Sequence, residues 1–224
     1  FSIHTKKRIS GKLIWFHGAS VGEILSVVPL IKKLEREKNI KQILVTSNTL
    51  SSSKILLNYR LKKTIHQFFP IDTNYHTQKF LNYWKPSNAI FIDSEIWPNM
   101  ITNIKKSSIS LILINARITS KSLKKWKIFS SYAQNFFQKF DLCLSSNLKS
   151  KKYLKILGAR KIKYIGNLKF AESEKYSDNL KKYLKKFLSS KKIWCASSTH
   201  DNEEIICATA HKKLKSKHKN LLTI

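Results

Sequence analysis

The sequence predicts a doubly wound α/β fold built on a parallel sheet, and two observations carry that prediction. Short runs of β-branched and aliphatic residues alternate with longer segments of helical period, which is the order that builds βαβ units. Runs such as Ala89–Ile92 and Leu111–Ile114 are apolar at every position, as strands buried on both faces of a parallel sheet should be. The chain has 224 residues and 42% hydrophobic residues, so it can form a core and is not a disordered basic tail.

Seven strands and six helical segments are expected before residue 170. The strands are read from β-branched or apolar runs bounded by polar residues: Lys12–His17, Gln42–Ser47, Ile65–Phe69, Ala89–Asp93, Leu111–Asn115, Leu142–Ser145 and Lys161–Ile165. Apolar residues at helical spacing predict helices near 20–38, 51–63, 74–84, 97–106, 120–139 and 148–157. Pro98 suits the first turn of the fourth helix, where its missing N–H leaves no hydrogen bond unmade.

The alternation of strand and helix patterns changes near residue 170. A polar, acid-rich stretch, Ala171–Asp178, precedes a basic helix that runs to about Ser189. A strand at Ile193–Ala196, a helix from Asp201 and a strand beginning at Leu221 follow. We interpret 1–170 as a Rossmann-like domain, 171–189 as a linker with a basic helix, and 190–224 as the truncated start of a second Rossmann-like domain. Apolar surface left exposed on that start would make the fragment prone to aggregation.

The charge favours an anionic partner without identifying it. The chain carries 43 Lys and Arg against 13 Asp and Glu, a net charge of +30. Nucleic acid, an acidic membrane surface and a phosphorylated substrate are all compatible with that charge. A Lys-biased solvated surface has equal weight, because most of the lysines fall on predicted helix faces. No apolar run is long enough to span a membrane, and the amino terminus lacks the pattern of a signal peptide. The three cysteines have no metal-ligand spacing and indicate reduced thiols, so no metal site is expected.

Candidate chemistry lies where predicted strands end, since ligands of doubly wound sheets bind at the carboxyl ends of the strands. Glu23 follows the first strand and could accept a proton from a hydroxyl, because a helix amino terminus favours the ionised carboxylate. The structural alternative is a capping box, with Ser20 as N-cap and Glu23 reaching back to it. Local spacing slightly favours that alternative.

Three further strand ends offer charged groups. Asp93 and Glu95 follow the fourth strand, and Glu95 could instead pair with a nearby Lys or Arg. Arg117 follows the fifth strand within Asn115-Ala116-Arg117 and supplies a cation. Lys169 follows the seventh strand beside Gly166; in so Lys-rich a chain a lone lysine would normally be a surface residue. No GxSxG or ordered Ser/His/Asp set is present, so hydrolase chemistry has little support.

Five motifs together resemble one family, the bacterial 3-deoxy-D-manno-octulosonic acid (Kdo) transferases. They occur in the family's order across essentially the whole chain: His17–Glu23, Asp93–Asn99, Asn115–Arg117, Gly166–Phe170 and Ala196–Glu204. The resemblance implies the GT-B glycosyltransferase fold, in which two Rossmann-like domains face each other. It also implies transfer of Kdo from CMP-Kdo to a hydroxyl of the lipid A precursor, lipid IVA, in lipopolysaccharide assembly at the cytoplasmic face of the inner membrane.

The resemblance also assigns roles. Glu23 matches the catalytic base, and Asp93 and Lys169 match the positions that stabilise the transition state. The family commonly has Glu where this chain has Asp93, which leaves open whether Asp93 or Glu95 performs that role. Ser20, Gly22, Glu95 and Arg117 are the candidate substrate-binding residues. Inverting transfer of this type needs neither metal nor cofactor, and the expected partners are CMP-Kdo, the lipid A precursor and an anionic membrane surface.

The family's hydrophobic amino-terminal anchor and most of its donor-binding domain are not matched by this sequence. We therefore expect a partial sequence, truncated at both ends, that associates peripherally with the membrane and is inactive alone. Restoring the downstream reading frame should restore activity. Two alternatives remain open: a basic Rossmann-like nucleic-acid-binding module, which the charge alone suggests, and another GT-B enzyme with a different sugar nucleotide. No nucleic-acid signature accompanies the charge, so no nucleic-acid partner is expected.

Overall fold

The computed structural model describes residues 6–170 and 182–224. The chain divides into two compact units, Phe1–Glu172 and Ser173–Ile224, here called unit 1 and unit 2. The division falls inside the segment expected as a linker, whose acid-rich part, Ala171–Asp178, lies outside the described residues. The basic helix expected in that linker is α8 (Lys182–Ser189), and it belongs to unit 2.

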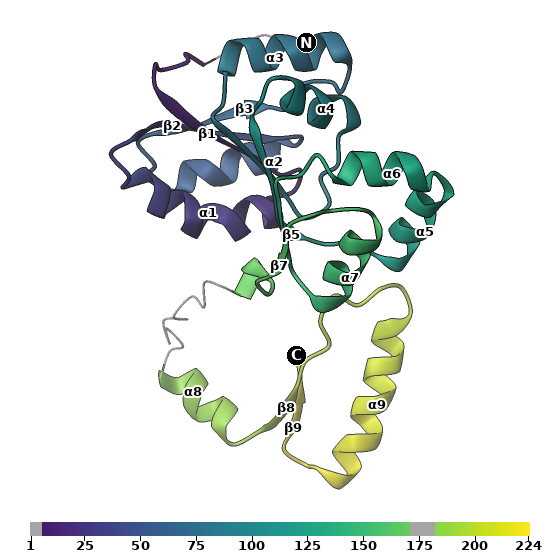
Figure 1. The fold of residues 1–224 in the computed structure, drawn as a ribbon. Coiled ribbons are helices and arrows are strands. Elements are labelled where there is room, and N and C mark those ends of the chain that lie inside the picture. Colours follow the sequence, from purple (N-terminus) through teal and green to yellow (C-terminus); the bar gives the residue numbers. More distant parts are fainter. Residues whose placement is uncertain (1–5, 171–181) are drawn as a thin grey trace. The chain divides into compact units, whose positions relative to one another are not determined.

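Unit 1 contains a seven-stranded sheet in which every neighbouring pair of strands is parallel. Its strands are β1 (Lys12–His17), β2 (Ile40–Ser47), β3 (Thr64–Phe68), β4 (Asn88–Ile92), β5 (Ser110–Ala116), β6 (Leu142–Ser145) and β7 (Ile162–Tyr164). They lie in the order β3-β2-β1-β4-β5-β6-β7 (Figure 1). The direction of winding reverses between β1 and β4, which confirms the doubly wound fold and creates a crevice at their carboxyl ends.

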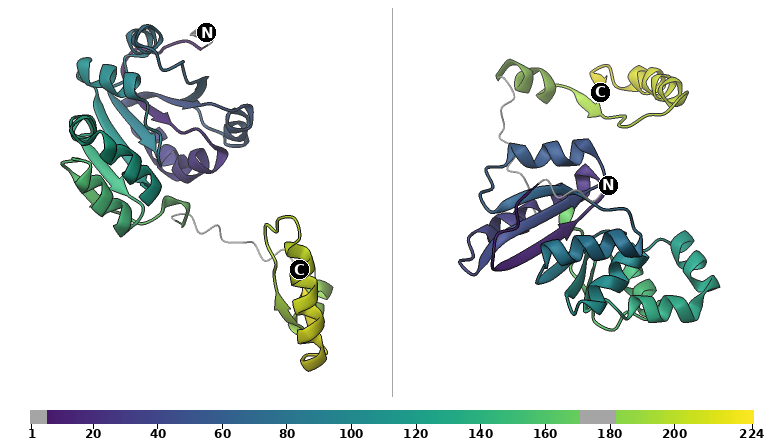
Figure 2. Two further views of the ribbon diagram at one scale, coloured as in Figure 1. Left: turned by 90° about the vertical axis from the view of Figure 1, so that its right-hand side faces the viewer. Right: turned by 90° about the horizontal axis from the view of Figure 1, so that it is seen from above.

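Helices cover both faces of this sheet (Figure 2). They are α1 (Val21–Glu35), α2 (Leu50–Ile55), α3 (Asn74–Trp84), α4 (Pro98–Lys106), α5 (Ser120–Ile128), α6 (Ser130–Phe137) and α7 (Leu148–Ile156), with short 3₁₀ turns η1 (Leu56–Asn58) and η2 (Leu168–Phe170). Each α-helix from α1 to α3, together with α5 and α7, begins at a Ser, Thr or Asn whose side chain accepts a backbone N–H of the first turn. Such caps satisfy N–H groups that have no partner within the helix.

Two apolar cores lie on the two faces of the sheet. One joins alternate strand residues such as Leu13 and Trp15 to side chains of α3, α4, α6 and α7. The other joins the intervening residues Ile14 and Phe16 to α1 and η1. Because successive side chains of a strand point to opposite faces, an uninterrupted apolar run can serve both cores at once. Burial on both faces of the sheet thus explains why these strands are apolar at successive positions.

The single helix expected at 120–139 is wrong, because the chain breaks at Phe129 into α5 and α6. Phe129 has φ −118° and ψ 59°, outside the helical region. The break lets the Trp126 ring stack on Phe136, with centroids 5.5 Å apart. In one straight helix these residues would be about 15 Å apart along the axis. Aromatic packing therefore outweighs continuation of the helix.

The helix expected at 51–63 is also too long. It ends as α2 and η1, and Tyr59 is already extended. The carboxylate of Glu35, at the end of α1, accepts the N–H groups of Lys62 and Lys63 at 3.0 and 2.8 Å. These contacts hold the following residues in an extended entry to β3. A residue distant in sequence thus decides where this helix stops.

Unit 2 is small. After α8 it contains β8 (Lys192–Trp194), α9 (Glu203–Lys217) and β9 (Leu221–Thr223), and the two strands pair in parallel. The β-α-β order agrees with the sequence prediction. No residue of α8 or α9 is buried, and apolar side chains such as Ile205 and Ile206 are two-thirds exposed. The described part of unit 2 therefore has no core of its own.

Candidate active site

The candidate site lies at the crevice formed by the strand-order reversal in unit 1. Glu23 stands in the first turn of α1, directly after β1, and Asp93 is the first residue beyond β4. Arg117 directly follows β5, and Lys169 lies in η2 after β7. Parallel strands bring these carboxyl ends to one edge of the sheet. The fold thus brings together charged residues that are up to 146 positions apart in the chain.

Glu23 is held by the loop that precedes α1. Its Oε2 accepts the Ala19 N–H at 2.8 Å, and its Oε1 accepts the Ser20 hydroxyl at 2.8 Å. Ser20 is the N-cap, and its Oγ accepts the Glu23 N–H at 3.3 Å. The capping interpretation is therefore correct, with Glu23 reaching one residue further back than expected. It does not exclude the functional interpretation, because each carboxylate oxygen retains a free lone pair.

Gly18 shapes the same loop. A Cβ at this position would lie 3.0 Å from Ile92 Cδ1 and 3.2 Å from Glu23 Cβ. The Gly18 N–H donates to the Thr46 carbonyl at 3.1 Å, which fixes the loop to β2. A side chain at position 18 would therefore require Ile92 or Glu23 to shift. The turn consequently sets the distance between Glu23 and the end of β4.

Asp93 does not belong to the fourth strand, contrary to the expected range. It has φ +59°, in the left-handed region that Asp and Asn adopt more readily than most residues. Its N–H donates to the Ile114 carbonyl at 2.9 Å, and its carbonyl accepts the Arg117 N–H at 3.2 Å. The neighbouring strand thus holds Asp93 by both backbone groups where the chain turns away from the sheet.

The charge of Asp93 is poorly compensated. Burial raises the pKa of its carboxyl, and the negative charge of Glu23 raises it further. The positive charges of Arg117 and Lys169 oppose this rise, and a smaller effect of Glu95 adds to it. These effects require all five groups to lie close together. The site therefore combines two carboxylates and two cations around Asp93.

Lys169 lies over the amino terminus of α1. A Cβ on Gly22 would be 3.5 Å from Lys169 Nζ and 3.8 Å from its Cε. The Asn167 side chain accepts the Lys169 N–H at 3.1 Å, and the Asn115 side chain accepts the Leu168 N–H at 3.0 Å. The end of the Lys169 side chain thus lies within contact distance of the first turn of α1, and two asparagines orient the turn that carries it.

Glu95 has a different environment from Asp93. Its Oε2 lies 3.2 Å from Nε2 of His17 and accepts the Trp97 indole N–H at 2.8 Å. Burial alone would raise the pKa of Glu95, but the hydrogen bonds from His17 and Trp97 outweigh it and hold the pKa below its usual value. The expected alternative, pairing with a Lys or Arg, is wrong. A buried histidine takes that place.

His17 connects two motifs and two strands. Its ring is fully buried and stacks on Phe69 with centroids 3.8 Å apart. Burial lowers the pKa of His17 and so favours the neutral imidazole, and Glu95 only partly offsets this effect. Its Nδ1 lies 3.0 Å from the Thr46 hydroxyl, which also accepts the Trp15 indole N–H at 2.9 Å. We assign the proton to Nε2, because that nitrogen faces a carboxylate oxygen of Glu95, which can only accept.

His17 and Asn115 belong to motifs that the sequence shows, but the sequence assigns no role to either residue. Both are polar residues at strand ends that the structure buries, to 0% and 2% exposure. A signal was present, since polar residues at the end of an apolar run that is buried on both faces need partners. The identity of those partners depends on the strand order, which the sequence does not state.

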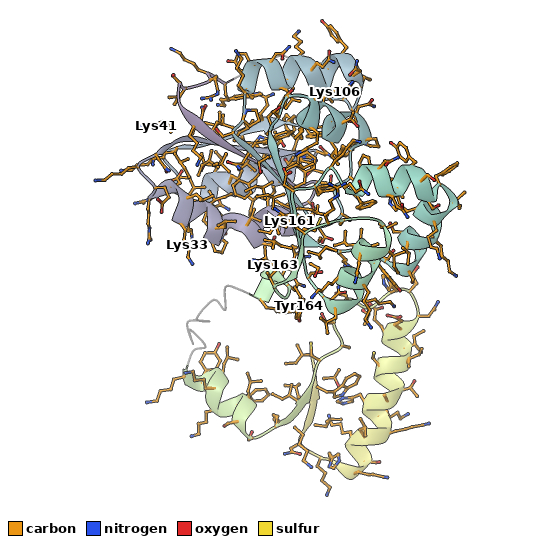
Figure 3. All side chains as sticks on the ribbon, in the orientation of Figure 1. Lys33, Lys41, Lys106, Lys161, Lys163 and Tyr164 are labelled. Atoms are coloured by element: carbon orange, nitrogen blue, oxygen red, sulfur yellow. The ribbon has the colours of Figure 1, made fainter. Side chains whose placement is uncertain are left out.

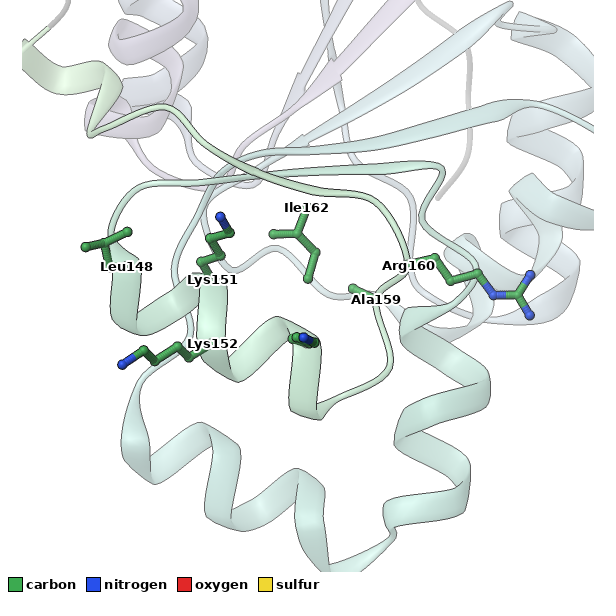
Figure 4. Close-up of a pocket in the computed structure, with 7 residues that line it drawn as sticks. Leu148, Lys151, Lys152, Ala159, Arg160 and Ile162 are labelled. Atoms are coloured by element: carbon green, nitrogen blue, oxygen red, sulfur yellow. The ribbon is translucent and has the colours of Figure 1, made fainter.

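Positive charge is spread over the surface of unit 1 (Figure 3). Lys33, Lys41 and Lys106, for example, come from α1, β2 and α4. A cavity of about 480 Å³ lies against α7 and the start of β7 (Figure 4). Its lining combines the apolar Leu148 and Ile162 with cations, among them Lys151 and Lys155. Neither this cavity nor a second one of about 470 Å³ beside α4 and α6 is lined by Glu23, Asp93 or Lys169.

Two features are absent from residues 6–170 and 182–224, the part of the chain that the structure describes. Over these residues, no helix combines the length and apolarity needed to cross a membrane. Within the same ranges, no group of three or more His, Cys, Asp or Glu side chains is arranged to hold a metal ion.

Residues 2–172, which include the whole site described above, match the sequence model of the 3-deoxy-D-manno-octulosonic acid transferase (kdotransferase) family. The chain belongs to this family. A Kdo transferase of Rickettsia bellii is 35% identical over 96% of the chain and 51% of its own length. A probable mitochondrial Kdo transferase of Arabidopsis thaliana is 32% identical over 97% of the chain and 50% of its own length. The chain thus spans about half the length of the curated relatives it matches.

Solved structures support the family's fold class. Staphylococcus aureus MnaA bound to UDP aligns with a TM-score of 0.62, at 18% identity, over 95% of this chain and 60% of its own. A UDP-GlcNAc 2-epimerase of Neisseria meningitidis aligns with a TM-score of 0.63, at 13% identity, over 95% of this chain and 64% of its own. At such identities the likeness shows the fold alone. The structures are GT-B-like, as expected from the sequence.

Proposed function

We propose that the protein containing this chain is a Kdo transferase that moves Kdo from CMP-Kdo to a hydroxyl of a lipid A precursor in lipopolysaccharide assembly. The observation that carries the proposal is the cluster of Glu23, Asp93, Arg117 and Lys169 at the crevice of a domain that matches the family. Unit 1 supplies the acceptor side. The donor would be held by the other half of the protein, as the family resemblance implies.

Glu23 is the proposed general base. Its carboxylate takes the proton of the acceptor hydroxyl while the hydroxyl oxygen attacks the anomeric carbon of Kdo. The bond from that carbon to the CMP phosphate breaks, and CMP leaves with its electron pair. Direct displacement of this kind inverts the configuration at the anomeric carbon. The hydrogen bonds from Ala19 and Ser20 aim the carboxylate, and a general base of this kind typically contributes 10²- to 10⁴-fold in rate.

Asp93, Lys169 and Arg117 complement the charges that develop during transfer. Glycosyl transfer passes through a state with oxocarbenium character, so positive charge accumulates on the sugar ring. The Asp93 carboxylate would stabilise that charge. The leaving CMP phosphate gains negative charge, which Lys169 and Arg117 would stabilise. We assign Asp93 rather than Glu95 to this role, because His17 and Trp97 already occupy Glu95.

The remaining candidates serve binding. Ser20 is the N-cap of α1 and Gly22 lies in its first turn, where an acceptor hydroxyl would approach Glu23. Glu95 acts through its 3.2 Å contact with His17 and its hydrogen bond from Trp97, which hold the chain that follows Asp93. We therefore assign Glu95 to support of the neighbouring chain rather than to direct substrate binding.

An anionic membrane surface is the proposed site of action, at the cytoplasmic face of the inner membrane. Between Ile96 and Phe170 the chain carries sixteen Lys and Arg and a single acid, Asp141. Each basic residue close to an anionic bilayer contributes about 1 kcal/mol of attraction. Peripheral attachment would place a phosphorylated lipid acceptor within reach of the site.

The test is a transfer assay with the protein expressed from its full reading frame. CMP-Kdo and lipid IVA in mixed micelles should yield Kdo-linked lipid, with undiminished rate in EDTA because the proposed transfer uses neither metal nor cofactor. Other sugar nucleotides should give no product. Transfer from a different donor at a higher rate would favour another GT-B activity. Salt-dependent binding to RNA that is tighter than binding to lipid A precursor vesicles would favour the nucleic-acid alternative.

A further inference from the structure

Asn115 lies where three segments that carry site residues meet. On one side of it in the chain, the Ile114 carbonyl accepts the N–H of Asp93. On the other side, the Arg117 N–H donates to the Asp93 carbonyl. Asn115 thus sits inside the backbone clamp that holds Asp93, although its own side chain takes no part in that clamp.

The Asn115 side chain reaches a third segment. Its Oδ1 accepts the N–H of Leu168 at 3.0 Å, across 53 residues of sequence. Asn115 itself is 2% exposed, and the bond is part-buried because Leu168 is only partly buried. Removal of the Asn115 side chain would take away the acceptor that holds this backbone N–H in place.

The backbone of Asn115 adds a second reason for its identity. Its φ is +55°, in the left-handed region, although the residue lies within β5. For a side-chain-bearing residue this conformation costs about 1 kcal/mol or more, and Asn tolerates it better than most. The twist turns the Asn115 side chain toward η2. The conformation persists because the clamp and the bond to Leu168 both depend on it.

Leu168 is the first residue of η2, and Lys169 is the next. The Leu168 side chain packs against the core beneath α1 and limits how far η2 lies from the helix. Packing of the aliphatic Leu168 side chain does not by itself fix the orientation of η2. The bond from Leu168 N–H to Asn115 fixes that orientation, and with it the direction in which the Lys169 side chain leaves the backbone.

We propose that Asn115 is a positioning residue that sets Lys169 against Asp93 and Glu23 by holding the Leu168 N–H. The inference rests on the proposed function, because it assigns Asn115 to the same transfer reaction. Asn115 itself touches neither substrate nor the reacting atoms. It links the β5 segment, which clamps Asp93, to the turn that carries the cation.

The experiment compares Asn115→Gly with Ser108→Gly in the protein expressed from its full reading frame. Glycine removes the side chain and accepts a positive φ without strain. Ser108 is the matched control, since it has φ +56° in an exposed turn at the opposite end of β5. Asn115→Gly should lower kcat about 10-fold or more and change the KM for CMP-Kdo by less than about twofold, because small misplacements of a charged group act on the transition state. Ser108→Gly should leave both constants unchanged.

A double-mutant cycle separates positioning from general weakening of the fold. If Asn115 acts through Lys169, Asn115→Gly should cause no further loss of kcat in the Lys169→Met background. Multiplicative losses in the double variant would overturn the proposal. So would an unchanged kcat in Asn115→Gly alone.

Hydrogen exchange of the Leu168 amide gives a readout that does not depend on activity. The amide should exchange faster in Asn115→Gly and at the wild-type rate in Ser108→Gly. Unchanged exchange in Asn115→Gly would overturn the proposed bond even if kcat fell. Absence of Kdo transfer in the wild-type protein would instead overturn the proposed function and the catalytic part of this inference, while the exchange rates would still report whether Asn115 holds η2.

Discussion

Two carboxylates, Asp93 and Glu95, lie two residues apart in the chain and have opposite electrostatic environments. Burial and the nearby charge of Glu23 raise the pKa of Asp93, and two cations only partly oppose the rise. Glu95 is also buried, but donors from His17 and Trp97 hold its pKa low. Asp93 thus retains unsatisfied charge toward the crevice, whereas the charge of Glu95 is used within the fold.

The difference between Asp93 and Glu95 shows how the end of one strand can serve both chemistry and stability. A charge that must act on a substrate cannot be fully compensated by the protein, so the fold carries it at some loss of stability. A charge that is fully hydrogen-bonded rigidifies the structure and is unavailable for chemistry. The predictions below test this division, from the largest expected effect to the smallest.

Loss of the base should have the largest effect. In the protein expressed from its full reading frame, Glu23→Gln should lower kcat by roughly 10²- to 10⁴-fold, because the amide cannot accept the acceptor proton. Glu37→Gln, at an exposed position after α1, is the matched control and should leave kcat unchanged. The measurement is the rate of Kdo transfer from CMP-Kdo, with circular dichroism to verify the fold. Full activity in Glu23→Gln would refute the assignment of the base.

Removal of the cation should come next. Lys169→Met keeps much of the length and apolar volume of the side chain and removes its charge, so kcat should fall about 10²-fold, as for loss of one group that stabilises transition-state charge. Lys163→Met removes an exposed charge from β7, in the same part of the chain, and should change the rate by less than about twofold. Equal losses in the two variants would indicate a general effect of net charge.

Glu95→Gln should destabilise unit 1 by about 1–2 kcal/mol, because the charged group that lies 3.2 Å from His17 Nε2 and accepts the Trp97 indole N–H becomes a neutral one. Thermal unfolding of this chain followed by tryptophan fluorescence is the measurement, since four of the five tryptophans lie in unit 1. His17 and Trp97 would remain in place as donors. Wild-type stability in Glu95→Gln would show that the charge of Glu95 does not stabilise unit 1.

Asp93→Asn should act in the opposite direction. The folded pKa of Asp93 is raised, so the folded state favours its protonated form, and stability decreases as pH rises through that pKa. At neutral pH the uncharged amide should therefore stabilise unit 1, by less than about 1 kcal/mol because solvent screens this half-exposed group. Activity should fall at the same time.

Asp141→Asn is the control of opposite sign for Asp93→Asn. Although burial alone would raise the pKa of Asp141, the Lys105 ammonium and the Leu111 N–H hold it low. Loss of that charge should consequently reduce stability at neutral pH. If Asp93→Asn and Asp141→Asn shifted the unfolding midpoint in the same direction, the proposed difference between the two carboxylates would be refuted.

The smallest effect is a dependence of stability on acid pH. Burial lowers the pKa of both His17 and His66, that of His66 to about 4. Below pH 6.5 the unfolded chain binds protons that the folded chain does not, so stability should decrease as pH falls. His66→Gln should flatten this slope between pH 6.5 and 4, and His200→Gln, at an exposed position, should not. Unfolding midpoints measured across this pH range provide the test.

Much of the fold could be predicted from the sequence because it depends on local patterns. Each of the seven strands of unit 1 is within two residues of its expected start and end. Apolar runs and turn residues are local signals that survive folding. The helix expected at 51–63 was too long, because Glu35 acts on its end from 27 residues away. The single helix expected at 120–139 was wrong, because the stack of Trp126 on Phe136 accompanies a break at Phe129 that local helical spacing does not show.

The candidate site was partly predictable for the same reason. Glu23, Asp93, Arg117 and Lys169 follow strands, and a parallel sheet gathers strand ends at one edge. The roles of His17, Thr46 and Asn115 could not be predicted, since each depends on a partner 29 to 78 residues away. Distant pairing of polar groups leaves no local pattern.

The sequence by itself determined that this chain is a parallel α/β protein with charged residues at the strand ends, because periodicity and chain order suffice for both. Only the tertiary structure decided which of two neighbouring carboxylates is free. The strand order β2-β1-β4 carries His17 to Glu95 and leaves Asp93 facing Glu23 and Lys169. The physical reason is that compensation of a buried charge depends on distances in space, and those distances are set by the packing of strands that lie far apart in the chain.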